Sequence, residues 1–307
     1  MLKRYTYKKI TWVDLESPSQ EEIREVMQEF HIDPLVAEEL LVPTVRPKVD
    51  LHENYLYLIL HFPAYLHNHG AAHDYGEQEV DFIVGKDFII TTHYEMVDPI
   101  HEFSKVFEVH SMVNRSVMGN HAGFVLFFIL RNLYRSLGYG LDAIGDDLEE
   151  IETHVFEGRE KKMVHALSGV SRDLLNFKQS IRLHKDVLES LENVGPDFFG
   201  AKFAPYMHTL IGEYYRISSE LESHRESFME LRETNDSLLT TKQNETMKVF
   251  TILAFVTFPL SLIASIFGMN TIDMPFVGYS GDFWVVIGIM VVATLLMFVY
   301  FRYKDWM

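Results

Sequence analysis

The chain has 307 residues, with 44 acidic against 27 basic side chains and a formal net charge of -17 at pH 7. This balance disfavours nucleic acid as a partner, because phosphate backbones are bound by Lys and Arg, and it favours cations. The chain has no cysteine, which excludes disulfides and thiolate metal sites and fits a cytoplasmic main body. No apolar segment follows Met1, so no cleavable signal sequence is predicted.

Residues 1 to about 115 alternate strand and helix signals, which predicts a small α/β (α+β) domain with a mixed sheet. Ser17 is predicted to cap the first helix, with Pro18 at its first position and Gln20 in the capping-box position. Asp33-Pro34 begins a second helix in the same way, and Gly85-Lys86-Asp87 predicts a hairpin. Strands are predicted at residues 2–7, 10–13, 45–51, 55–61, 78–84 and 88–93.

Three histidines, His67, His69 and His73, lie close together in a polar segment. Such a group is able to bind a transition metal. A solvated loop is the favoured interpretation, because no carboxylate or cysteine at ligand spacing completes a site.

From Gly119 onward the pattern is helical. A helix over about 121–156 begins apolar and ends acidic, and Gly158 interrupts the pattern. A second helix is predicted over about 161–192, ended by Gly195-Pro196. A third is predicted from about 202 to 267 without a break.

The third helix carries an apolar heptad pattern, which we call the seam and which predicts coiled-coil-like packing. Its positions are spaced by four and three residues in alternation: Phe203, Met207, Leu210, Tyr214, Ile217, Leu221, His224, Phe228, Leu231, Asn235 and Leu238.

Two apolar runs near the C-terminus, residues 247–267 and 283–301, predict a membrane hairpin. About 20 helical residues cross a hydrocarbon core of about 30 Å. The segment between the runs, 268–282, holds three Gly, one Pro and two Asp, and predicts a short loop.

The basic residues predict the orientation of this hairpin. The loop has no Lys or Arg, whereas Lys242 and Lys248 flank the first run and Arg302 and Lys304 follow the second. The positive-inside rule therefore places both termini in the cytoplasm and the loop outside.

A second periodic set, which we call the stripe, runs along the first span and contains most of its small and polar residues. Traced backwards, it continues through Ser237, Glu233, Glu230 and Glu226. Two interpretations stay open from spacing alone: the wall of a conduit formed by several copies, or close helix packing through small residues. The stripe comprises Asn244, Met247, Thr251, Ala254, Phe258, Ser261, Ser265 and Gly268.

The C-terminal motifs resemble the CorA family of divalent-cation channels. Gly268-Met269-Asn270 ends the first span, Met274-Pro275 follows, and a basic-aromatic tail ends in Lys304-Asp305-Trp306-Met307. Asn244-Glu245-Thr246-Met247-Lys248-Val249 and Pro259 also match. The whole chain fits the family layout, although about 65 C-terminal residues carry the specific motifs.

The resemblance implies a homopentamer in the cell membrane that conducts hydrated Mg²⁺ passively, with Co²⁺ or Ni²⁺ as further substrates and no organic cofactor. It implies an ion-selectivity ring of Gly268, Met269 and Asn270, with Asn244 at the inner end of the pore. Met247 and Phe250 would form an apolar constriction. The alternative for Met247 is ordinary packing between helices. The expected parts are an α/β domain (1–117), a helical funnel (118–243) and a transmembrane hairpin (244–307).

The family closes when Mg²⁺ occupies acidic sites between protomers, for which Glu233 and Asp236 are the candidates here. Two departures affect ion preference: Phe276 replaces the usual acid after Met-Pro, which leaves Asp273 and Asp282 as the loop acids, and Ser265 replaces a small Gly. Two alternatives remain, namely a proton-coupled Zn²⁺ transporter of the same fold and a membrane-tethered sensor or scaffold that does not conduct. No enzyme motif is present.

Overall fold

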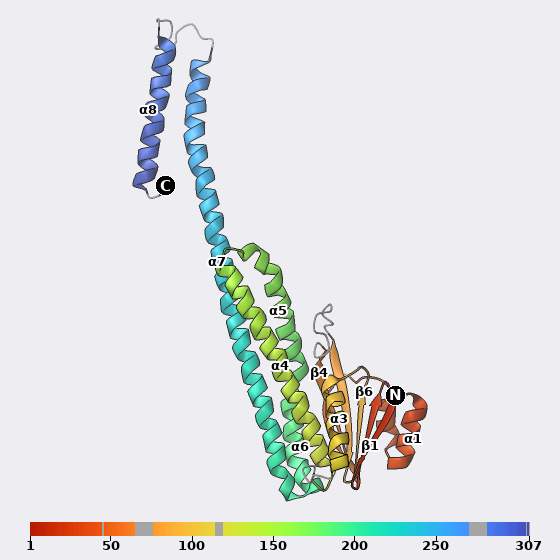
Figure 1. Cartoon of the computed structure of the whole chain (residues 1–307). Helices are drawn as coiled ribbons and strands as arrows, with labels where there is room; N and C mark the ends of the chain where they lie inside the picture. The colour runs from red at the N-terminus through yellow and green to blue at the C-terminus, as the bar shows by residue number, and fades with distance from the viewer. Residues whose placement is uncertain (45, 65–75, 114–118, 270–280, 305, 307) are drawn as a thin grey trace. The chain divides into compact units, whose positions relative to one another are not determined.

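The structure is a computed structural model that describes the chain except residues 45, 65–75, 114–118, 270–280, 305 and 307. The described chain divides into two compact units, Met1–Arg232 (unit 1) and Glu233–Met307 (unit 2). Unit 1 contains a sheet and most of the helices, and unit 2 contains two long helical segments (Figure 1). The predicted histidine group at 67–73 lies outside the described residues.

The sheet of unit 1 is six-stranded and mixed, as predicted, with the order β1-β2-β6-β5-β4-β3. Strands β2 and β6 pair in parallel and their neighbours pair antiparallel. The strands are β1 (Leu2–Tyr7), β2 (Ile10–Glu16), β3 (Lys48–Leu51), β4 (Tyr55–Pro63), β5 (Glu77–Gly85) and β6 (Phe88–His93).

The remaining regular elements of the described chain are helices. Helix α3 follows the last strand and was not among the predicted elements. The helices are α1 (Gln20–Phe30), α2 (Pro34–Glu39), α3 (Asp98–Val113), α4 (Gly123–Phe156), α5 (Glu160–Ile181), α6 (His184–Phe199), the 3₁₀ turn η3 (Ala201–Phe203), α7 (Ala204–Phe267) and α8 (Asp282–Tyr303).

Helices cover both faces of the sheet, to which alternate side chains of each strand point. On one face, Val13 and Ile83 join Val26 of α1 and Val36 of α2 in a buried apolar cluster. On the other face, Trp12 packs against Phe103 and Phe107 of α3, with ring centroids 5.6 and 5.4 Å apart. Figure 1 shows the helices on either side of the strands.

The predicted cap of the first helix is wrong by two residues. Ser19 is the N-cap of α1, and it forms a reciprocal capping box with Glu22. Ser17 instead has a positive φ of 43°, and its backbone N–H donates to the His93 carbonyl at 2.8 Å. Ser17 therefore ties the end of β2 to the end of β6, and the helix begins after that link.

The predicted second long helix is two helices, α5 and α6, separated at Arg182 and Leu183. His184 begins α6 and is fully buried. Its Nδ1 accepts the Tyr134 hydroxyl at 2.8 Å, and its Nε2–H donates to the His61 carbonyl at 2.7 Å. Burial lowers the pKa of His184 to about 4, which keeps the ring neutral as these bonds require. The break thus places one histidine between α4, α6 and β4.

The predicted stop at Gly195-Pro196 is also wrong, since α6 continues to Phe199. A proline removes one backbone donor, and the helix tolerates this loss in its final turn. The helix ends at Gly200, whose φ of 96° and ψ of 153° are accessible mainly to glycine.

Gly200 offers a test of this ending. A Cβ would meet no atom within 4 Å at Gly200 or at Gly212 in α7, but only Gly200 has a positive φ. We expect Gly200→Ala to lower the free energy of unfolding by about 1–3 kcal/mol. Gly212→Ala is the matched control, expected to raise it by about 0.5–1 kcal/mol. Thermal unfolding of the full-length chain in detergent, followed by circular dichroism, measures both; equal effects would contradict this role of Gly200.

The predicted seam is the packing face of α7 within unit 1. Its residues Met207, Leu210, Ile217, Leu221 and Phe228 are buried. Helix α4 meets this face through glycines. A Cβ on Gly138 would lie 3.7 Å from Cδ1 of Ile217, and one on Gly145 would lie 3.0 Å from Cε1 of His224. The absent side chains let the two helices approach closely.

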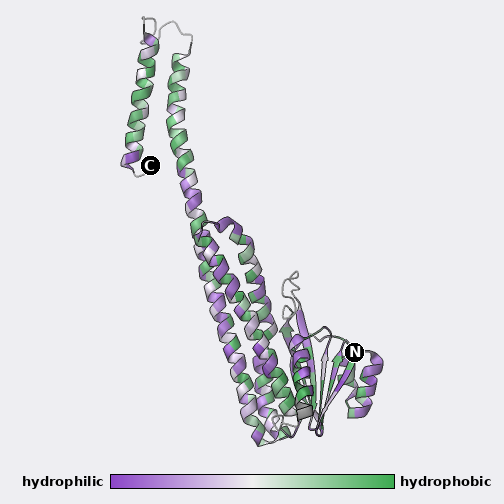
Figure 2. Ribbon diagram, viewed as in Figure 1, coloured by the Kyte–Doolittle hydropathy of each residue, from purple (hydrophilic) through white to green (hydrophobic). Residues whose placement is uncertain are grey.

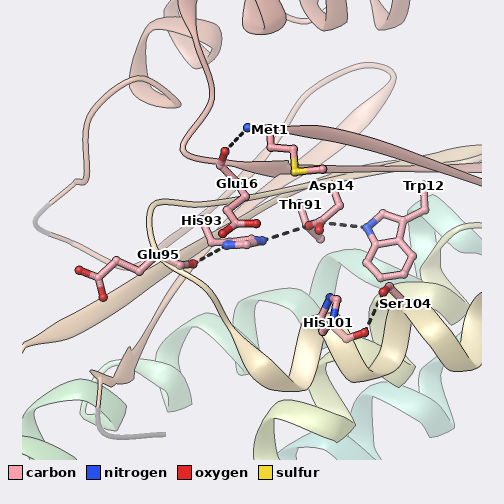
Figure 3. A network of polar contacts seen from close by, with 9 residues as sticks. All are labelled: Met1, Trp12, Asp14, Glu16, Thr91, His93, Glu95, His101 and Ser104. Atoms are coloured by element: carbon pink, nitrogen blue, oxygen red, sulfur yellow. Dashed lines mark hydrogen bonds and ion pairs between the residues drawn. The ribbon is translucent and has the colours of Figure 1, made fainter. Parts of the chain in front are cut away.

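A buried polar network links β2 and β6 (Figure 3). His93 Nε2 lies 3.2 Å from Asp14 Oδ1, and His93 Nδ1 lies 2.5 Å from the Glu95 carbonyl. Asp14 also accepts the Thr91 hydroxyl at 2.6 Å, and Thr91 accepts Trp12 Nε1–H at 3.0 Å. Burial opposes charge on His93, but the hydrogen bond and charge of Asp14 outweigh it and raise the pKa of His93. Both ring nitrogens therefore donate, as an imidazolium does.

A second buried group lies on the opposite face of the sheet, around Asp81 and Glu79 of β5. Burial, followed by the charge of Glu79, raises the pKa of Asp81 well above its ordinary value. A protonated Asp81 is able to donate to Glu79, which two carboxylates cannot do. Glu79 in turn contacts His61 Nε2 at 3.1 Å and accepts the Thr44 N–H at 2.5 Å.

The acid pair predicts a pH dependence of stability. The folded chain holds the Asp81 proton more tightly than the unfolded chain, so stability falls as pH rises from about 4 towards the raised pKa. Asp81→Asn is expected to remove this loss and to raise the thermal midpoint at pH 8 but not at pH 4. The exposed Asp87 supplies the control Asp87→Asn, expected to leave the pH profile unchanged. A wild-type profile retained by Asp81→Asn would refute the raised pKa of Asp81 as its cause.

Candidate functional site

Two helices among the described residues are long and apolar enough to cross a membrane, α7 in its C-terminal part and α8. None of the residues in their most apolar windows is buried. Figure 2 shows both segments predominantly hydrophobic. Contiguous exposed apolar surface of this extent is rare in water-soluble proteins and is ordinary in a bilayer.

The predicted pore-lining residues all lie on this part of α7. Asn244, Met247, Phe250, Phe258, Ser261 and Ser265 are exposed in the single chain, and Thr251 and Ala254 are half-buried. Phe250 follows Met247 by three residues, so the two apolar side chains are neighbours on the helix surface. The Thr251 hydroxyl donates to the Met247 carbonyl at 2.8 Å and is thereby turned towards the backbone.

Helix α7 ends immediately before the predicted selectivity residues. The Gly268 N–H donates to the Ala264 carbonyl at 2.9 Å, and a Cβ on Gly268 would lie 3.1 Å from that same oxygen. A side chain at this position would therefore lie in tight contact with the backbone of the last turn of α7. Met269 is 57% exposed. Asn270 and Asp273 lie outside the described residues.

Asp282, predicted as a loop acid, is the first residue of α8. Its Oδ1 accepts the backbone N–H of Phe283 at 2.7 Å. Gly281 precedes it with a φ of 114°. A carboxylate at this position stabilises a helix N-terminus by interacting with the helix dipole.

Trp306, in the basic-aromatic tail, contacts α8. The backbone N–H of Trp306 donates to the Phe301 carbonyl at 3.0 Å, and the two aromatic rings stack with centroids 6.0 Å apart. Phe301 also meets Phe255 of α7 at 6.4 Å and is only 4% exposed. Sequence reasoning used the tail only for topology and for the family resemblance, because a contact between chain segments gives no periodic signal.

The proposed regulatory acids Glu233 and Asp236 are both exposed on α7. Within the part of the chain that the structure describes, no group of three or more His, Asp or Glu side chains is placed to hold a metal ion. In unit 1 the stripe continues as exposed residues, including Ser223, Glu226 and Glu230.

The sequence was compared with protein families and with curated proteins. The family of CorA-like Mg²⁺ transporter proteins matches residues 7–303. A cobalt/magnesium transport protein CorA from Thermotoga maritima is 28% identical over 302 residues, which cover 97% of this chain and 83% of that protein.

Solved structures share the fold. The CorA magnesium transporter from Methanocaldococcus jannaschii superposes with a TM-score of 0.81 at 21% identity, covering 99% of this chain and 94% of that one. The ZntB cytoplasmic domain from Vibrio parahaemolyticus superposes with a TM-score of 0.60 at 17% identity, covering 77% and 89%.

The fold and the two apolar helices define a class of membrane proteins that move ions and are not enzymes. Within that class, the chain belongs to the CorA-like Mg²⁺ transporter family. It is therefore a divalent-cation transporter with two candidate C-terminal spans.

Proposed function

We propose that the chain conducts hydrated Mg²⁺ passively into the cytoplasm, with Co²⁺ and Ni²⁺ as further substrates. One observation carries the proposal: Gly-Met-Asn begins where the exposed apolar α7 ends, at Phe267. Mg²⁺ loses its water shell reluctantly. A ring of Asn270 amide oxygens would hold the ion through that shell weakly enough to release it.

The conduit requires several copies of the chain. Two helices cannot enclose a pore, because polar groups that line a pore must be shielded from lipid on all sides. A closed ring of identical copies provides this shielding. The family resemblance implies five copies. The stripe would line the pore, with Asn244 at its inner end and Met247 and Phe250 as an apolar constriction that closes by dewetting.

Regulation would use the exposed acids of the long helices. Cytoplasmic Mg²⁺ bound by Glu233 and Asp236 together with an acid of the neighbouring copy would hold the pore closed. In this assignment, 1–117 form the cytoplasmic α/β domain, 118–243 the funnel and 244–307 the hairpin. Both termini lie in the cytoplasm and the spans cross the cell membrane, in line with the basic residues Arg302 and Lys304 after α8.

The test is ion uptake by the full-length chain in proteoliposomes that contain a Mg²⁺-sensitive dye. Uptake of Mg²⁺ that needs no pH gradient, and that falls when Mg²⁺ is preloaded on the cytoplasmic side, is the expected result. Zn²⁺ uptake that depends on a pH gradient would establish the proton-coupled alternative. No flux of any divalent ion would favour a sensor or scaffold.

A further inference from the structure

A groove lies between α7 and α8 within unit 2. Its volume is about 640 Å³, within the range of small-molecule sites. Phe255 and Pro259 of α7 face Ala293, Leu296 and Met297 of α8 across it, and Lys304 lies at one end. Its walls are thus apolar, and its end carries a cation.

The groove has a defined depth in the bilayer. Tyr300, Tyr303 and Trp306 cluster with Arg302 and Lys304 at the end of α8, and aromatic and basic residues of this kind mark the headgroup level. From Lys304 to Ala293 is 11 residues, or about 16 Å along a helix. Half of a hydrocarbon core is about 15 Å thick. The groove therefore opens at the headgroups and extends through one leaflet.

The charge at the mouth lacks a partner from the described chain. Lys304 is the basic residue that lines the groove, and no described carboxylate forms an ion pair with it. Between Lys248 and Lys304 the described residues include one carboxylate, Asp282, which lies at the opposite end of α8. The walls are made mostly of large side chains, whereas close helix–helix contacts in membranes favour small ones.

We propose that this groove binds an anionic phospholipid, with its phosphate at Lys304 and an acyl chain between Pro259 and Ala293. Basic pockets between spans on the cytoplasmic side are suited to anionic headgroups. The stacked Trp306 and Phe301 rings line the groove together with Lys304. The inference rests on the proposed membrane placement of α7 and α8, and not on conduction.

The test is native mass spectrometry of the full-length chain in detergent, titrated with phosphatidylglycerol or phosphatidylcholine of identical acyl chains. Wild type is expected to prefer phosphatidylglycerol. Lys304→Ala is expected to weaken the binding of phosphatidylglycerol about fivefold, which is the effect of one basic residue. The affinity for phosphatidylcholine is expected to stay unchanged. Arg302→Ala makes the same change of charge outside the groove lining, and is expected to retain the preference.

A second pair of variants tests the acyl site. Ala293→Trp fills the groove and is expected to abolish retention of both lipids, whereas Val292→Trp, at an exposed neighbouring position, is expected to retain both. Equal affinity of wild type for the two lipids, or equal effects of Lys304→Ala and Arg302→Ala, would overturn the proposal. Loss of oligomer mass in Ala293→Trp with lipid retention unchanged would show that a second copy fills the groove. Mass spectrometry detects bound lipid without measuring ion flux. A chain that fails to conduct can therefore still be tested for lipid binding, and the two failures are distinguishable.

Discussion

Replacing Asn270 by alanine is expected to reduce Mg²⁺ uptake in proteoliposomes to the rate of protein-free vesicles. In the proposed ring, the Asn270 amide oxygen would replace bulk water around the shell of the entering ion, and a methyl group offers no acceptor. Because the proposed ring repeats the residue in every copy, one substitution removes all of its amides together. Dye fluorescence during a Mg²⁺ gradient measures the effect.

The matched control is Asn193→Ala, which removes an amide from the exposed surface of α6. It is expected to leave uptake unchanged. Size-exclusion chromatography establishes that both variants assemble as the wild type does. Uptake retained by an assembled Asn270→Ala variant would place selectivity elsewhere on the chain.

Replacing Asp14 by alanine is expected to produce the largest loss of stability in unit 1, about 3–5 kcal/mol in the free energy of unfolding. Removing one partner of a buried ion pair leaves the other charge uncompensated. Both side chains are nearly inaccessible, at 5% for His93 and 7% for Asp14. The Thr91 hydroxyl loses its acceptor as well.

The pH profile separates the ion pair from simple loss of packing. The raised pKa of His93 means that its contribution is fully present below the ordinary histidine pKa of about 6.5 and is lost as pH rises through the folded value. The deficit of Asp14→Ala should therefore shrink at alkaline pH. Chemical denaturation of the full-length chain in detergent at pH 6 and pH 9 measures it, and a deficit independent of pH would indicate a packing effect alone.

Local signals predicted most of the elements. The strands were predicted to within a few residues because β-branched and aromatic runs reflect short-range preference. The start of α2 was predicted from Asp33-Pro34, and Asp33 indeed accepts the Leu35 N–H at 2.8 Å. The N-cap of α1 was predicted at Ser17 instead of Ser19 because either serine is able to cap a helix. Ser17 is used in the link between β2 and β6, so Ser19 is the cap.

The features that sequence reasoning missed in unit 1 include contacts between distant residues. The break before His184 depends on His61, 123 residues away in sequence, and on Tyr134. The Asp14 and His93 pair joins residues 79 apart. A strand pattern shows that positions alternate between faces, but it does not show which polar side chains meet on a buried face.

The sequence by itself determined the two apolar helices, the position of Gly-Met-Asn after the first of them and the membership of a cation-transporting family. Hydropathy and helix length are properties of a continuous segment, because each span satisfies its own backbone hydrogen bonds. Only the tertiary structure decided the buried pairs of unit 1, the docking of Trp306 on Phe301 and the groove that ends at Lys304. These features arise where separate segments meet, and their energies depend on the burial that packing creates.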